Sequence, residues 1–211
     1  MKRIHPLLFF LLGFFVTSVA QIVAKVDKIV KEDNYYSAYS DQYSGPSYVV
    51  YKLYQGGGDS SRKGINFTSR LPHYNYNKSG YDIGHLAPAE DFAYSGKLMK
   101  STFKYYNALP QTPNLNRGNW KKVESAVRRM SRGDSLLIIA GGLDFRKTER
   151  GYVPENCFKV VYSLSTGKCL FTGTFTNTDK CVFTRNEELA KKFPFEQTRK
   201  LVEYIDVKKR K

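Results

Sequence analysis

The sequence has few of the residues from which metal clusters and disulfide frameworks are built. Its 211 residues include three cysteines, three histidines and one tryptophan. The cysteines show neither Cys-x-x-Cys nor Cys-Cys-His spacing, so a structural zinc site is not indicated. No internal repeat or low-complexity segment is present, which excludes a solenoid built from repeats. A length of 211 residues fits one sizeable domain better than two.

Acidic residues are scarce relative to basic ones. The chain has 34 Lys and Arg against 19 Asp and Glu, a formal net charge of +15. With 41% hydrophobic and 15% aromatic residues, the composition is that of a globular protein. A positive field of this size attracts polyanions such as nucleic acid, anionic glycans or acidic membrane surfaces. A basic surface with no partner is the alternative, because charge alone does not identify a ligand.

The N-terminus carries a short apolar run flanked by a positive segment and by small residues. Lys2 and Arg3 precede the apolar block 7–16, and Ser18 and Ala20 occupy the positions that a signal peptidase reads. We therefore predict a signal peptide over residues 1–20, export to the periplasm or the medium, and no stable membrane association after cleavage. An uncleaved membrane anchor is the alternative, although the block is short for a bilayer span.

Export would place the three cysteines in an oxidising compartment, where a disulfide is plausible. Cys169 and Cys181 flank the segment CLFTGTFTNTDKC, which is typical of two strands around a turn. These two could pair across a hairpin and leave Cys157 free. Three free thiols remain the alternative, since the sequence does not fix the pairing.

The order of expected elements indicates one α+β domain over residues 21–211. Alternating or continuous apolar runs predict strands, and a 3.6-residue apolar period predicts a long central helix that ends near Gly133. Residues 21–45 are polar and rich in tyrosine, so we expect an arm laid on the domain, and residues 206–211 form a basic tail. The expected strands are 47–55, a short strand between Ile65 and the break at Pro72, 135–143, 158–164 and 169–175, and the expected helices are 115–132, 187–193 and 195–202.

Four amide side chains lie within ten residues, just before the long helix. They are Asn107, Gln111, Asn114 and Asn116, in the segment NALPQTPNLNRGNW. Turn formation and helix capping explain such residues well, and this reading is favoured for Asn114. Asn116, at the helix entrance, can present a carbonyl oxygen of the kind that suits Mg²⁺, a cation that keeps most of its waters.

Successive i, i+4 steps along the helix bring polar groups onto one broad face. The residues are Asn116, Trp120, Glu124 and Arg128. Glu124 could hold water molecules of a hydrated cation, and Arg128 could contact a phosphate oxygen. An ordinary surface ion pair between Glu124 and Arg128 is the competing explanation, and such pairs are common on helices.

His85 stands 31 residues before Asn116, in the segment YDIGHLAPAEDF. A neutral imidazole beside a hydrated Mg²⁺ can take a proton from water that attacks phosphorus. A lone histidine next to glycine is more often structural, and Asp82 and Glu90 could either orient the ring or cap turns.

These segments together resemble the signature of the DNA/RNA non-specific endonucleases, a family of ββα-metal (His-Me finger) nucleases. The resemblance covers about residues 47–164. It implies the ββα-metal fold, an α+β architecture with a central, mainly antiparallel sheet flanked by helices. The matching residues are Asp82, Gly84, His85, Ala87, Pro88, Asn107, Pro110, Gln111, Leu115, Asn116, Trp120 and Glu124.

The resemblance also implies roles for individual residues. His85 corresponds to the general base, and Asn116 to the single direct protein ligand of Mg²⁺, with Mn²⁺ as an alternative. Glu124 corresponds to the residue that holds waters of the cation, Arg128 to a basic residue near the phosphate, and Asn107 to an amide that shapes the site.

The family's upstream arginine, which steadies the transition state, corresponds to Arg62, with Arg70 as the competing candidate. Two positions depart from the pattern. Ile83 stands where the family has arginine, and Tyr106 where it has serine. The loss of a guanidinium beside the base predicts a slower reaction unless Arg62, Lys63 or Arg70 replaces it.

The sequence therefore predicts an exported, Mg²⁺-dependent endonuclease with DNA and RNA as substrates. The resemblance implies water attack on the phosphodiester and 5′-phosphate ends. A catalytically weak or inactive protein of the same fold that binds nucleic acid or another polyanion is the alternative, with Ile83 as its main support.

Overall fold

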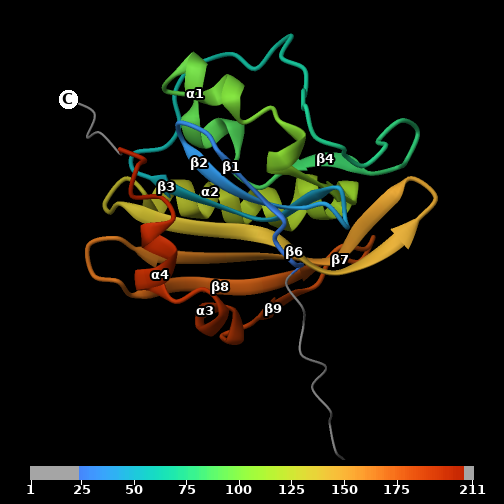
Figure 1. Ribbon diagram of the computed structural model, residues 1–211. Coiled ribbons are helices and arrows are strands. Elements are labelled where there is room, and N and C mark those ends of the chain that lie inside the picture. The colour runs from blue at the N-terminus through green and yellow to red at the C-terminus, as the bar shows by residue number, and fades with distance from the viewer. Residues whose placement is uncertain (1–23, 207–211) are drawn as a thin grey trace, which may run out of the picture.

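A seven-stranded antiparallel sheet forms the centre of the molecule, in a computed structural model that describes residues 24–206 (Figure 1). The strand order is β1-β2-β3-β6-β7-β8-β9, and neighbouring strands are antiparallel throughout. The strands are β1 (Lys28–Lys31), β2 (Tyr35–Ser40), β3 (Gly45–Leu53), β6 (Leu136–Thr148), β7 (Gly151–Ser163), β8 (Cys169–Thr176) and β9 (Phe183–Arg185).

A smaller two-stranded antiparallel sheet and a long helix lie against this central sheet. The small sheet pairs β4 (Asp82–His85) with β5 (Ala108–Gln111), and His85 lies opposite Ala108. Between these strands the chain forms η1 (Ala89–Phe92), α1 (Gly96–Ser101) and η2 (Tyr105–Asn107). After β5 come a π-helical segment, η3 (Leu115–Trp120), and the helix α2 (Lys121–Met130).

Each face of the central sheet carries its own hydrophobic core because successive side chains of a strand point to opposite faces. In β6, Leu136, Ile138 and Ala140 pack toward the small sheet and α2, whereas Leu137 and Ile139 pack toward the other face. That other face is covered by α3 (Glu188–Lys192) and α4 (Phe195–Lys200). Figure 1 shows α1, α2 and β4 on one side of the long strands and α3 and α4 on the other.

The strands and helices expected from residue 47 onward are confirmed with small shifts of their ends, except for the short strand expected before Pro72, where only an isolated bridge between Thr68 and Lys104 forms. β3, β6, β7 and β8 match the four predicted strands, although β6 and β7 extend into a longer hairpin. The long helix is confirmed but interrupted: Gly118 has non-helical dihedral angles (φ −101°, ψ −108°) inside η3. The predicted helices after residue 186 are confirmed as α3 and α4.

The expectation of an N-terminal arm over residues 21–45 is wrong for the part that the structure describes. The chain from Lys28 forms β1 and β2, and all six residues of β2 are buried between β1 and β3. The polar tips of this strand have partners, because the Tyr35 hydroxyl donates to the Ser101 carbonyl oxygen (3.0 Å) and the Tyr39 hydroxyl to that of Pro72 (2.6 Å). Satisfied hydroxyl groups can be buried at little cost.

Of the two alternatives left open for the cysteines, the structure has the second, because Cys157, Cys169 and Cys181 are all free thiols. The segment does form the hairpin β8–β9, but its register pairs Gly173 with Arg185. Cys169 begins β8 opposite Tyr162 of β7, whereas Cys181 follows the far end of the strand. The two thiols therefore lie at opposite ends of β8.

The predicted signal peptide (residues 1–20) lies outside the described residues, as does the basic tail beyond Asp206. Among residues 24–206, none of the helices is both long and apolar enough to cross a membrane.

Candidate active site

A polar pocket of about 460 Å³ lies where β4, η1 and the long helix meet. It brings together five of the six predicted site residues, which come from the loop after β3, from β4, from η3 and from α2. The lining residues are Arg62, Ile83, His85, Pro88, Ala89, Glu90, Asn116, Arg117, Lys121, Glu124, Ser125 and Arg128. Four of them are arginine or lysine, so the pocket suits an anionic ligand.

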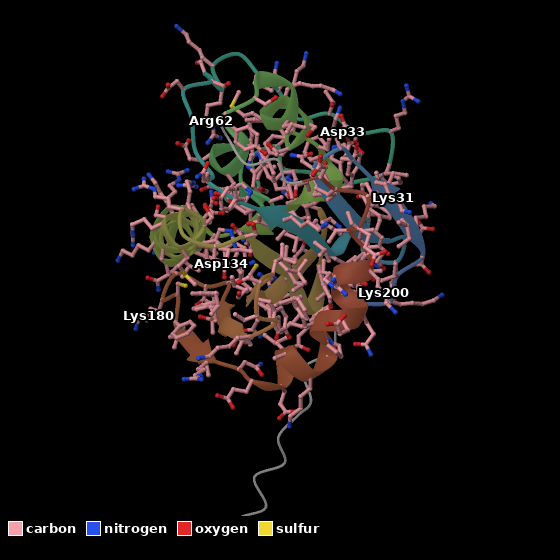
Figure 2. All side chains as sticks on the ribbon, turned by 90° about the vertical axis from the view of Figure 1, so that its left-hand side faces the viewer. Lys31, Asp33, Arg62, Asp134, Lys180 and Lys200 are labelled. Atoms are coloured by element: carbon pink, nitrogen blue, oxygen red, sulfur yellow. The ribbon has the colours of Figure 1, made fainter. Side chains whose placement is uncertain are left out.

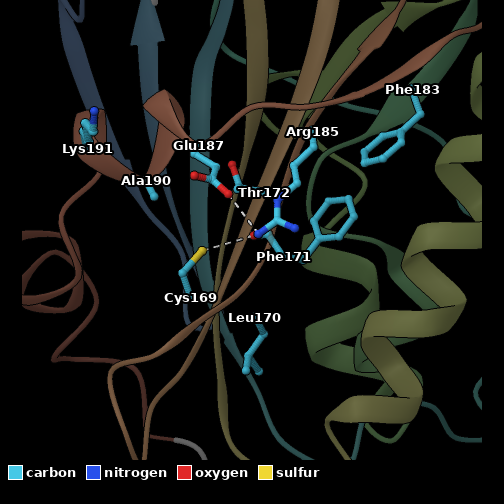
Figure 3. Close-up of a pocket in the computed structure, with 9 residues that line it drawn as sticks. All are labelled: Cys169, Leu170, Phe171, Thr172, Phe183, Arg185, Glu187, Ala190 and Lys191. Carbon is cyan, nitrogen blue, oxygen red and sulfur yellow. Dashed lines mark hydrogen bonds and ion pairs between the residues drawn. The ribbon is translucent and has the colours of Figure 1, made fainter.

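A second pocket, of about 590 Å³, lies at the β8–β9 edge (Figure 3) and has no comparable chemistry. Its polar groups bind one another: Arg185 pairs with Glu187 (2.9 Å), and the thiol of Cys169 donates to the carbonyl oxygen of Phe171. The Thr172 hydroxyl donates to a backbone carbonyl of the same region. The pocket around His85 is therefore the candidate active site.

The strand β4 depends on a glycine at position 84. Gly84 pairs with Leu109, and a Cβ atom at Gly84 would lie 2.1 Å from Oε1 of Gln111 on the neighbouring strand. A methyl group cannot approach that closely, so alanine at position 84 would displace the buried Gln111 side chain from its place beside β4. Gly84 therefore allows Gln111 to pack directly against the strand that carries His85.

The imidazole of His85 packs between Phe67 and Phe103, with ring centroids 4.7 and 4.9 Å away. Its Nε2 atom is buried and has no hydrogen-bond partner among the described residues. Burial, and to a lesser extent the Arg62 guanidinium, lowers the pKa of His85 to about 3. The ring is therefore neutral at physiological pH, and the part of it that lines the pocket, rather than the buried Nε2, faces any water molecule or substrate group there.

Asn116 reaches the pocket from η3 and is held by Asp82. Its Nδ2 donates to Oδ2 of Asp82 (3.0 Å), so the amide carbonyl oxygen is not used in that contact. Arg117 also binds Asp82, through Nε at 2.8 Å and Nη2 at 2.6 Å. The hydrogen bonds from Arg117 hold the pKa of Asp82 below its ordinary value. Asp82 therefore orients Asn116, whereas an interaction with the His85 ring is not observed.

Glu124 and Arg128 do not form the i, i+4 surface pair that competed with the functional prediction. Arg128 instead donates Nε to Oδ1 of Asp91 (2.8 Å), and that carboxyl group is buried. The Tyr51 hydroxyl also donates to Asp91 (3.1 Å). Burial raises the pKa of Glu124 to about 7, with Asp91 adding to the effect, whereas Lys159 and Arg128 oppose it.

Arg62 lines the pocket, and Arg70 does not. The Arg62 guanidinium lies over the Phe103 ring, 5.5 Å from its centroid, and Figure 2 shows Arg62 on the loop above α2. Arg70 instead lies near the phenol of Tyr106, whose pKa it lowers slightly against the raising effect of burial. Ile83, on the same face of β4 as His85, also lines the pocket rather than the core.

Asn107 is fully buried and does not line the pocket. Its Oδ1 accepts from the backbone N–H of Ala87 (2.9 Å), and its Nδ2 donates to the carbonyl oxygens of Ala87 and Thr102 (2.9 Å each). The predicted shaping role is therefore indirect: Asn107 fixes the backbone that follows His85, and it cannot contact a substrate.

Three site residues were missed by sequence reasoning. Arg117 and Lys121 line the pocket, and Asp91 binds Arg128 from η1. The first two could have been found from the helix period, since residues 117, 121, 124 and 128 follow one face. Asp91 had no such signal, because it stands beside Glu90 in AEDF and either carboxylate could have faced inward.

The donor set in the pocket fits a divalent cation that keeps most of its water. Among residues 24–206, no group of three or more His, Cys, Asp or Glu is placed to hold a metal ion. The Asn116 carbonyl oxygen, with Glu124 further along the same helix, is a donor set of hard oxygens with few direct ligands. That combination suits Mg²⁺ better than zinc or calcium.

An antiparallel strand pair with histidine at the end of one strand, followed by a helix with an amide at its start, defines a ββα-metal nuclease fold. A family model described as DNA/RNA non-specific endonuclease matches residues 19–209. The chain therefore belongs to the DNA/RNA non-specific endonuclease family.

Individual relatives agree with this assignment. The chain is 30% identical to mitochondrial endonuclease G from Bos taurus over 135 residues, which are 59% of this chain and 45% of the relative. It is 36% identical to a nuclease from Nostoc sp. over 107 residues, 49% of this chain and 39% of the relative. The matched region thus spans less than half the length of these curated relatives. A solved EndoG structure, from a complex with its inhibitor EndoGI, superposes with a TM-score of 0.65 at 21% identity and covers 79% of this chain and 84% of that one.

Proposed function

We propose that this protein is a divalent-metal-dependent endonuclease that hydrolyses phosphodiester bonds of DNA and RNA. The observation that supports the proposal most is that His85 and Asn116, from two separate segments, line one basic pocket. Family membership supports the reaction class, because the relatives named above are nucleases.

His85 acts as the general base in this proposal. Its ring is neutral and lines the pocket, so it can accept a proton from an attacking water there. A pKa of about 3 describes the free pocket, in which burial and then the positive charge of Arg62 lower the pKa of the ring. A phosphodiester that enters beside the ring adds negative charge and raises the pKa of the imidazole, which makes it a stronger base when substrate is bound.

Asn116 would hold Mg²⁺ through its carbonyl oxygen, and Mn²⁺ would fit the same donor set. The chemistry that the cation supplies when bound is neutralisation of the charge that develops on the phosphate oxygens. Asp82 keeps the Asn116 side chain oriented. Glu124, as a carboxylate, accepts hydrogen bonds from water molecules in the pocket, which requires a pH near or above its pKa of about 7.

Arg62, Arg117, Lys121 and Arg128 give the pocket its positive charge. Contacts of this kind bind the phosphate backbone without reading sequence, which suits both DNA and RNA. Ile83 occupies the position where the family has arginine. Arg62 is the cation best placed to replace that arginine, since it lies close enough to the His85 ring to lower the pKa of His85. Hydrolysis with 5′-phosphate ends and export through residues 1–20 belong to the same proposal.

A polyanion-binding protein without catalysis is the second candidate function, and the apolar Ile83 in the pocket wall favours it. Under either candidate function the protein would retain DNA at low salt, but only an enzyme would cut it. The test is incubation of the purified protein with supercoiled plasmid, single-stranded DNA and RNA, each in Mg²⁺, Mn²⁺ and EDTA. We expect cleavage of all three with either cation and none in EDTA. Binding of all three substrates without cleavage would support the second candidate.

A further inference from the structure

A lysine lies inside the hydrophobic core directly behind the candidate active site. Lys159 is fully buried, with no exposed surface, in the middle of β7 and opposite Ala140 of β6 and Gly173 of β8. Its neighbours at two-residue spacing, Cys157 and Val161, belong to the core beneath α2. The alternation of the strand therefore directs the Lys159 side chain toward α2.

The ammonium group has an aromatic neighbour but no hydrogen bond. Its Nζ lies 4.4 Å from the centre of the Trp120 ring, and no hydrogen-bond partner for it is present among residues 24–206. A buried cation over an indole gains a cation–π attraction, which is strengthened by the low local dielectric. An unpaired buried ammonium is otherwise costly, so nearby negative charge must compensate it.

That negative charge comes from the two acidic groups behind the pocket. Glu124 and Asp91 are the carboxylates whose charges oppose the lowering of the Lys159 pKa by burial. Arg128 is committed to Asp91 through its 2.8 Å hydrogen bond. Two carboxylates thus lie beside two cations, and Lys159 is the cation left for Glu124. The remaining titratable groups that face this cluster are the Tyr51 hydroxyl, bound to Asp91, and the Cys157 thiol.

We propose that Lys159 is a positioning residue of the active site, which supplies the buried counter-charge for Glu124 and supports the Trp120 ring from below. Trp120 in turn donates Nε1 to the carbonyl oxygen of His85 (3.1 Å). Lys159 does not reach the pocket and contacts no substrate. Its effect on the reaction rests on the proposed nuclease function, whereas its effect on the charge balance of the core does not.

Thermal unfolding in EDTA tests the charge balance without any catalysis. The variants are Lys159→Met, which keeps the side-chain length, Glu124→Gln, and both together. Lys159→Met leaves two carboxylates with one cation, so we expect its loss in unfolding midpoint to be larger at about pH 8 than at about pH 5. Adding Glu124→Gln should restore part of the unfolding midpoint that Lys159→Met loses. The loss that remains should then be the same at the two pH values.

Lys52→Met is the matched control, because Lys52 lies on β3 and donates to the Ile205 carbonyl oxygen on the opposite face of the sheet. Its loss in midpoint should add to that of Glu124→Gln. Additive losses for Lys159→Met and Glu124→Gln, equal at both pH values, would overturn the proposal. If Lys159→Met alone does not fold, recovery of folded protein by Glu124→Gln supports it, and failure to recover contradicts it.

Steady-state cleavage in Mg²⁺ separates positioning from mere packing. We expect Lys159→Met to lower kcat by at least about tenfold with little change in KM, and to move the acid limb of the rate profile to higher pH. Lys52→Met should leave both unchanged. A loss of kcat with an unmoved acid limb would assign Lys159 a packing role only. Absence of cleavage by the wild-type protein would instead contradict the proposed function and leave the unfolding result to decide on Lys159.

Discussion

The indole nitrogen of Trp120 donates a hydrogen bond to the carbonyl oxygen of His85 at 3.1 Å. This contact joins the end of β4 to the start of α2, two segments 35 residues apart in the chain. Trp120 is almost fully buried, and Leu115 and Phe175 belong to the same core. The position of His85 relative to Asn116 and Glu124 is thus fixed by the hydrophobic core together with the hydrogen bond from Asn116 to Asp82.

The choice between the two upstream arginines can be tested by matched substitutions. Arg62→Ala removes a cation from the pocket wall and should lower kcat by about 10²-fold, as expected for the loss of one group that stabilises transition-state charge. Arg70→Ala should change kcat little, because Arg70 does not line the pocket. Plasmid-cleavage kinetics measure both. The reverse order of effects would move the assignment to Arg70.

Substitution of two asparagines near the start of the long helix, Asn116 and Asn114, tests which of them binds the cation. Asn116→Ala should raise the Mg²⁺ concentration needed for half-maximal cleavage by at least about tenfold. Asn114 donates to the Asp179 carbonyl oxygen instead, so Asn114→Ala should leave the Mg²⁺ dependence unchanged. Calorimetric titration of the metal gives the same comparison without substrate. Equal Mg²⁺ affinity of both variants would show that Asn116 is not the ligand.

Glu124 should make stability and activity respond to pH in opposite directions. Its pKa rises on folding from about 4.5 to about 7, so its contribution to stability is fully present below about pH 4.5 and is lost as pH rises through about 7. In the proposed mechanism activity needs the carboxylate of Glu124, so the rate should increase over the same pH range. The lowered pKa of His85 has the opposite effect on stability, which it reduces as pH falls from about 6.5 to about 3.

The difference between wild type and Glu124→Gln isolates the carboxylate from the histidine. Chemical unfolding of both proteins across this pH range, in EDTA, is the measurement. A difference in the free energy of unfolding that does not change between pH 4.5 and 7 would contradict the raised pKa of Glu124.

Gly84 should tolerate no side chain. A Cβ at this position would lie 2.1 Å from Gln111, so Gly84→Ala should cost about 1–3 kcal/mol or more in unfolding free energy and reduce activity through displacement of His85. Gly133→Ala is the control, since no atom lies within 4 Å of its Cβ position and its φ is not positive. Denaturant titration measures both, and a fully stable Gly84→Ala protein would contradict the close packing of Gln111 against Gly84.

Sequence reasoning located most of the pocket because the matched residues are concentrated in two short segments with fixed spacing. His85, Asn116, Glu124 and Arg128 lie within those segments, and the structure brings them to one pocket. Arg62 lies in a loop of variable length, so spacing alone could not separate it from Arg70.

The remaining features required knowledge of which side chains are buried. The strand β2 has the sequence YYSAYS, and all six of its residues are buried. Because its tyrosines and serines carry hydroxyl groups, the segment looks polar, and a search for apolar patterns does not predict that it is buried. Lys159 stands in FKVVYS as a single charge that could belong to an exposed face of a strand. Only the packing of α2 on one face of the central sheet, and of α3 and α4 on the other, shows that β7 has no exposed face there.

The most direct test of the account is plasmid nicking by His85→Ala beside His73→Ala, in Mg²⁺ and in EDTA. His73 is the other histidine that the structure describes; it is exposed and stacks on Tyr105, with ring centroids 3.7 Å apart. We predict that His85→Ala lowers the rate in Mg²⁺ by about 10²- to 10⁴-fold, that His73→Ala cuts at nearly the wild-type rate, and that EDTA stops every variant. Cleavage by His85→Ala at the rate of wild type would contradict the central claim.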